Sequence, residues 1–157
     1  MKGFATLCAL LLLITLPAFA LDDVELTLGG SLNDTEGVGT SAALNAEGLT
    51  EVGPGLAGPA FEYRYSNPHQ GKSYSATGYG AVYEFRLGRS KIRPLLGGRL
   101  LYLTGDALSE WSGGIRAGIV SGGEGGFVKV YAERTYGFGG GDGGDQDALV
   151  VALGFRL

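Results

Sequence analysis

The strongest constraint on the fold is a two-residue period that returns along most of the chain. It is clearest in the last nine residues, LVVALGFRL, where the intervening positions are smaller or, at Arg156, charged. The apolar and mostly large positions of this stretch are Leu149, Val151, Leu153, Phe155 and Leu157. A two-residue period is that of an extended strand with two unlike faces. The sequence therefore predicts strands that are apolar on one face only.

Eight segments carry this period and are bounded by clusters of Gly, Pro, Asn, Asp and Ser, which favour turns. They span residues 23–31, 37–45, 57–66, 74–86, 91–103, 111–120, 126–136 and 147–157. Each is long enough for the roughly 9 to 11 residues that a tilted strand needs to cross the hydrocarbon of a bilayer. An even number of strands lets an up-and-down barrel begin and end on the same side.

The links between these segments fit the same plan with one exception, and one proline inside a segment needs a separate explanation. The links at 87–90 and 121–125 are short, as the turns on one side of such a barrel usually are, but the link at 46–56 is longer. Pro94 lies inside the fifth segment and cannot donate to a ladder, so we expect a bulge there or a strand that begins after it.

Glycine excludes the alternative of a helical fold. It accounts for 30 of the 157 residues, and each glycine inside a helix costs about 1 kcal/mol relative to alanine. We therefore expect an all-β chain.

Ten charged residues share the face opposite to the apolar one. They are Glu25, Glu62, Arg64, Glu84, Arg86, Arg93, Arg99, Arg116, Lys129 and Glu133. If this face met lipid, each Arg or Lys near the midplane would cost about 2 to 4 kcal/mol. The charged face is therefore expected inside, as a lumen charge network in which acids and bases nearly balance. The predicted fold is an eight-stranded antiparallel up-and-down transmembrane β-barrel with a side-chain-filled lumen.

One residue pair and one single residue test this assignment of faces. A tight hairpin between the fourth and fifth strands predicts that Glu84 lies opposite or next to Arg93 in the lumen. Arg134 shares the apolar face of its strand, which is tolerable only near the end of the strand, where the side chain could reach the headgroups.

Residues 1–20 have the features of a secretory signal peptide, with a positive start, a short apolar run and small residues at the cleavage spacing. The expected mature domain, 21–157, has no cysteine and carries 11 basic against 16 acidic residues, which argues against nucleic acid as a partner. The single histidine, His69, lies in a predicted turn without a catalytic partner, and we expect no enzyme site and no cofactor. The acidic, glycine-rich loop at 139–147 is expected to be a flexible hairpin loop rather than a calcium site.

The alternation from Leu149 to Leu157 is similar to the closing strand of bacterial outer-membrane β-barrel proteins, which the barrel-assembly machinery reads. The stretches PLLGGRLLYLTGDALSEWSGGIRAGI (Pro94 to Ile119) and VYAERTYG (Val130 to Gly137) resemble the YfaZ family of small outer-membrane proteins. More generally, the chain resembles eight-stranded barrels of the OmpA and OmpX type. These resemblances imply a location in the bacterial outer membrane after export, with lipid and the assembly machinery as partners, and they imply no catalytic residues.

Three functions are compatible with the pattern. The first is a non-enzymatic outer-membrane barrel with a structural or envelope-interaction role. The second is a narrow, porin-like channel for small solutes, which would open if the inner charges changed partners. The third is a soluble periplasmic barrel of lipocalin shape, with the apolar face inside and the charges outside.

Overall fold

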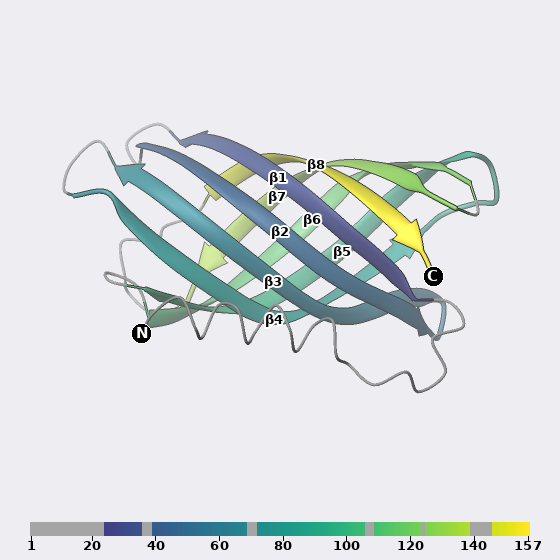
Figure 1. Cartoon of the computed structure of the whole chain (residues 1–157), viewed down its shortest axis with the longest axis horizontal. Coiled ribbons are helices and arrows are strands. Elements are labelled where there is room, and N and C mark those ends of the chain that lie inside the picture. The colour runs from purple at the N-terminus through teal and green to yellow at the C-terminus, as the bar shows by residue number, and fades with distance from the viewer. Residues whose placement is uncertain (1–23, 36–38, 69–71, 106–108, 124, 139–145) are drawn as a thin grey trace.

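The computed structural model describes residues 24–35, 39–68, 72–105, 109–123, 125–138 and 146–157. These residues form one closed antiparallel barrel of eight strands, in which each strand pairs with the next and β8 pairs with β1 (Figure 1). The strands are β1 (Glu25–Thr35), β2 (Gly39–Val52), β3 (Gly55–Pro68), β4 (Tyr74–Arg86), β5 (Ile92–Gly105), β6 (Ser109–Gly122), β7 (Phe127–Gly137) and β8 (Gln146–Arg156). Across the residues described, no helix is both long and apolar enough to cross a membrane.

The two ends of the barrel differ in their connections. One end, which we call the turn end, carries the links β2–β3, β4–β5 and β6–β7 together with the C-terminus. The opposite end, the loop end, carries the links β1–β2, β3–β4, β5–β6 and β7–β8. This all-antiparallel arrangement confirms the predicted fold class.

The predicted boundary between the second and third strands is wrong. Residues 46–56 were expected to form a link, but β2 continues to Val52 and the turn consists of Gly53 and Pro54. Gly53 adopts a φ of 60°, which glycine reaches without strain. The small residues of this stretch gave it the composition of a loop, although its alternation continues through Asn45, Glu47 and Leu49, whose side chains are all buried.

Pro94 is accommodated inside β5 by its place at the end of the ladder. The last paired residues of β4 and β5 are Arg86 and Leu95, and Pro94 lies just beyond them. Its carbonyl still accepts a hydrogen bond from the backbone N–H of Leu87, at 2.9 Å. No bulge or later start of the strand is therefore required.

The barrel exposes its apolar face and buries its charged one. Leu28 and Leu153 on the outside are 64% and 53% exposed, whereas Glu84 and Lys129 on the inside are fully buried. This polarity is the reverse of that expected for a soluble barrel of lipocalin shape.

Apolar side chains share the interior with the charges. One cluster joins Leu49, Ala60, Val82, Leu101 and Leu103, and a second joins Leu95, Tyr131 and Val150. The sequence analysis did not place these residues inside, because runs such as Leu100–Leu103 are apolar at almost every position and hide the period. Together with the charges they fill the lumen.

Candidate functional site: a charge network through the barrel

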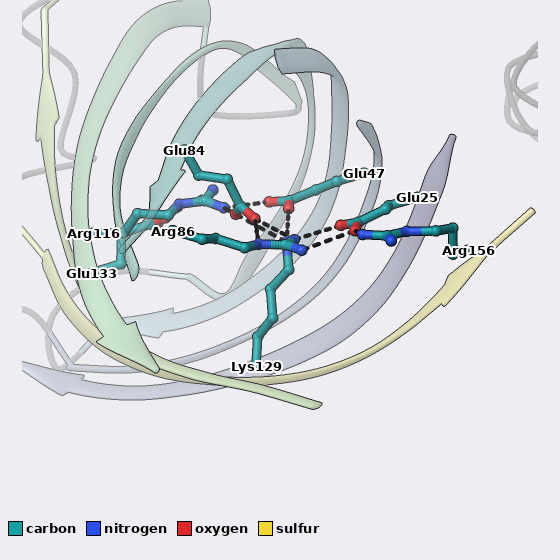
Figure 2. A network of polar contacts seen from close by, with 8 residues as sticks. All are labelled: Glu25, Glu47, Glu84, Arg86, Arg116, Lys129, Glu133 and Arg156. Carbon is teal, nitrogen blue, oxygen red and sulfur yellow. Dashed lines mark hydrogen bonds and ion pairs between the residues drawn. The ribbon is translucent and has the colours of Figure 1, made fainter. Parts of the chain in front are cut away.

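Among the described residues, a continuous series of ion pairs runs through the lumen from the turn end toward the loop end. Figure 2 shows the part of the series from Arg156 to Glu133. In order, its members are Arg156, Glu25, Arg86, Glu84, Lys129, Glu47, Arg116, Glu133, Arg99, Glu62 and Arg64. Cations and carboxylates alternate, so each carboxylate contacts at least two cations, and Glu84 also reaches Arg116 at 3.9 Å. All eight strands contribute at least one member. We call this set the lumen network.

The middle of the lumen network is fully desolvated. Lys129 contacts Glu84 at 2.9 Å and Glu47 at 3.5 Å, and Arg116 contacts Glu47 at 2.7 Å. Arg116 also reaches Glu133 at 3.3 Å. Burying an isolated charge is very unfavourable, so these groups are stable here only because opposite charges lie on both sides of each.

The two ends of the lumen network are held differently. At the turn end, Glu25 accepts hydrogen bonds from Arg86 at 2.9 Å and from Arg156 at 2.7 Å. The Arg156 side chain is 38% exposed, so the network reaches water there. Toward the loop end, Arg99 bridges Glu133 at 2.5 Å and Glu62 at 2.6 Å. Arg64 ends the series and is buried.

Two aromatic rings of β7 support the cations. The guanidinium carbon of Arg86 lies 4.9 Å from the ring centre of Phe127, and that of Arg116 lies 4.7 Å from the ring centre of Tyr131. Such contacts are favourable for a desolvated cation. The Phe127 ring lies so close over Gly154 of β8 that a Cβ there would collide with it. The glycine thus makes room for the ring that supports Arg86.

The structure brings together nine of the ten residues that were predicted to line the lumen. The tenth, Arg93, lies on the same inward row of β5 as Arg99, but no ion pair joins it to another described residue. The predicted pairing of Glu84 with Arg93 is wrong, because Gly97 lies opposite Glu84 in the register. Glu84 instead contacts Arg86 and, from β7, Lys129.

Sequence reasoning missed three acidic or basic residues of the interior. Glu47 was assigned to a link. The signal that could have placed it in the lumen is the alternation that continues beyond Asn45. Arg156 lies between apolar positions of β8 and was not counted among the lumen charges. Glu110 lies just before the predicted strand at 111–120 and was not counted either, but it is buried, and neither of its carboxylate oxygens has a hydrogen-bond partner among the described residues.

The remaining candidates contribute little chemistry. His69, Asp142 and Asp145 lie outside the described residues. Asp147 is exposed and pairs with Arg134 at 3.7 Å. Within the described ranges, no group of three or more His, Cys, Asp or Glu residues could hold a metal ion. What the lumen network itself can do is hold the eight strands around a neutralised, side-chain-filled axis.

The solved structures that resemble the chain share the observed architecture. No protein-family model and no curated protein matches the chain. Among solved structures, neisserial surface protein A is similar with a TM-score of 0.66 at 11% identity, over 86% of this chain and 96% of that chain. The N-terminal β-barrel domain of OprF from Pseudomonas aeruginosa is similar with a TM-score of 0.55 at 16% identity, over 85% of this chain and 96% of that domain. At these identities the likeness is one of fold, and it supports the predicted eight-stranded barrel type.

Proposed function

We propose that the chain is a non-enzymatic barrel of the bacterial outer membrane with a structural or envelope-interaction role. The observation that supports this most strongly is the combination of an exposed apolar belt with the lumen network. A belt that includes Leu28, Leu100 and Leu153 is suited to acyl chains, and the charges of the lumen network are paired with one another rather than presented to a substrate.

The lumen network favours a closed barrel over a channel. Opening a path for solutes requires that pairs such as Glu47 with Arg116 and Glu84 with Lys129 separate inside a desolvated lumen. Breaking a buried pair leaves uncompensated charge and costs about 3 to 5 kcal/mol. The network therefore disfavours steady conduction by the native protein.

Export and assembly belong to the same proposal. Residues 1–20, the expected signal peptide, lie outside the described residues. The outward positions of β8, from Leu149 to Phe155, match the apolar alternation expected of a strand that the barrel-assembly machinery recognises. The resemblance of 94–119 and 130–137 to the YfaZ family is consistent with a small outer-membrane barrel of this kind.

Two measurements test the proposal. Cell fractionation should release the protein only with detergent, and its gel migration should change on heating, as expected for a membrane barrel. Release by osmotic shock would reject the membrane location. In planar bilayers the wild-type barrel should show no steady conductance. The E84Q variant, which loses one lumen carboxylate charge, is measured beside it as the barrel with a perturbed network. Steady wild-type channels would favour the small-solute channel instead.

A further inference from the structure

One cation of the inward row of β5 stands outside the lumen network. Arg93 points inward at the turn end, is partly exposed, and forms no ion pair with any residue that the structure describes. Its Nε atom is buried and has no hydrogen-bond partner among those residues. A buried donor on a charged group is costly when it has no acceptor. The fold therefore leaves this guanidinium with donor capacity that no described side chain uses.

The nearest neighbours of Arg93 offer no acceptor side chain. Its partner in register on β6 is Val120, which is apolar and fully buried. On the other side, Arg86 of β4 pairs with Leu95, two residues along β5 from Arg93. Arg86 and Arg93 are thus diagonal neighbours on the inward face, within reach of long side chains. Two like charges so placed repel each other unless an anion lies near them.

The acidic side chains of the turn end are engaged elsewhere. Glu25 lies between Arg86 and Arg156 and accepts a hydrogen bond from each (Figure 2). Glu84 is already shared by cations of the lumen network. The remaining described acidic side chain at this end, Glu51, is exposed on β2, which does not neighbour β5 in the barrel. The basic charge around Arg93 is therefore not balanced by the described residues beside it.

Two further cations precede Arg93 on the β4–β5 link. Arg89 and Lys91 are both exposed, and neither forms an ion pair with a described residue. The carbonyl of Lys91 accepts a hydrogen bond from the backbone N–H of Gly122 at 3.2 Å, and Arg93 itself lies in the ladder with β6. Lys91 and Arg93 are therefore presented by a backbone that is tied to the next strand, as a preorganised site requires.

We propose that the turn-end mouth of the barrel binds a phosphate-type oxyanion, with Arg93 as its main ligand and Lys91 as a second cation. A guanidinium matches a phosphate group with two parallel hydrogen bonds, and an ammonium adds a point charge. Several cations around one mouth attract a doubly charged anion more strongly than a singly charged one, which favours a phosphate monoester over a carboxylate. The phosphate can belong to a soluble ester or to a lipid headgroup. The site goes beyond the proposed function, since it concerns the lumen mouth whichever compartment that end faces.

The test titrates anions into the purified full-length barrel in lauryldimethylamine oxide, a detergent without phosphate, at neutral pH and constant ionic strength. NMR follows the Nε–H resonance of Arg93, which R93Q identifies by its loss. The probes are glycerol phosphate, dihexanoyl phosphatidic acid and acetate. At least one of the two phosphate monoesters should shift the resonance saturably, whereas acetate should not. Because the two esters differ only in their acyl chains, the tighter one identifies the source of the phosphate.

Three variants separate a built site from general attraction to a basic link. Measured by phosphorus NMR of the ligand, R93Q should weaken binding by about tenfold or more, as expected for the loss of charge-assisted hydrogen bonds, and K91Q by about threefold. R89Q is the matched control, because it removes the same charge from the same link, and it should change affinity by less than about twofold. Since Arg93 is not part of the lumen network, R93Q should keep its heat-modifiable migration.

Three outcomes would overturn the inference. They are equal losses of affinity in R93Q and R89Q, binding of acetate as tight as that of the phosphate esters, and an Arg93 resonance that neither ester shifts. None of these outcomes bears on the membrane location, which fractionation tests separately.

Discussion

At the scale of single residues, Arg116 shows how the lumen distributes charge. It lies between the carboxylates of Glu47 and Glu133, and its Tyr131 contact covers one face of the guanidinium. Removing it would leave two buried carboxylates with one cation fewer between them. The stability of each network member therefore depends on its neighbours along the series.

The R116M variant should lose about 3 to 5 kcal/mol of unfolding free energy, because it leaves buried charge uncompensated. E47Q should also destabilise, but the double variant should lose less than the sum of the two, as expected for groups in direct contact. Denaturant unfolding in lipid vesicles, followed by the fluorescence of the single tryptophan, Trp111, measures these energies. K72Q, at an exposed position, should change stability by less than about 0.5 kcal/mol. Strictly additive losses would contradict the pairing of Glu47 with Arg116.

At the scale of elements, two neighbouring glycines differ in whether a side chain fits: Gly58 of β3 has no room for a Cβ, whereas Gly48 of β2 has. A Cβ at Gly58, on the inward row, would collide with the backbone carbonyl of Gly48 on the adjacent strand. A Cβ at Gly48 points outward and would meet only Leu26 and Pro59 side chains, at 3.7 and 3.9 Å. The two strands can therefore approach closely only where β3 has no side chain.

G58A should reduce the fraction of correctly folded barrel strongly, because backbone rather than a flexible side chain must move. G48A is the matched control and should fold like the wild type, since 3.7 Å is ordinary van der Waals contact. The measurement is the fraction of heat-modifiable protein after refolding into detergent micelles. Equal yields of the two variants would show that the strands separate easily at this point.

β8 leads to a prediction about assembly. Phe155 lies on its outward face, is 55% exposed, and pairs in register with Leu26 of β1. Because we propose that the barrel-assembly machinery recognises this strand, F155A should reduce the amount of assembled barrel in cells much more than it reduces refolding in vitro. Val128, also outward and 40% exposed, provides the control V128A. Parallel losses in cells and in vitro would point to stability rather than recognition.

The strands show which parts of the molecule were predictable. Alternation is local, so the inward direction of Glu62 and Arg64 followed from the residues around them. Contacts across the lumen depend on the register of all the strands, and Glu47 and Arg116 are 69 positions apart. The local pattern of β4 and β5 could not reveal that Gly97, rather than Arg93, lies opposite Glu84. Leu101 and Leu103 were missed because their neighbours are equally apolar.

At the scale of the whole molecule, the apolar belt predicts that the cost of an outward-facing charge depends on its depth in the bilayer. Leu100 lies near the middle of β5 and Ile92 at its turn end, and both point outward, with 48% and 59% of their surface exposed. In a bilayer, L100R should cost about 2 to 4 kcal/mol, whereas I92R should cost about 0 to 1 kcal/mol. Unfolding in lipid vesicles measures both. Equal costs would show that the belt does not lie in the hydrocarbon of the membrane.

The participation of every strand in the lumen network has a consequence for biogenesis. A nascent sheet that lacks its last strand leaves Glu25 without Arg156, and a sheet that lacks β7 as well leaves Glu47 and Glu84 without Lys129. We expect such intermediates to keep the interior hydrated until β8 closes on β1, because burying the unpaired charges would be costly. At the proposed membrane location, truncated chains would carry these uncompensated charges into the acyl layer at a cost, so we expect only the complete set of strands to insert stably.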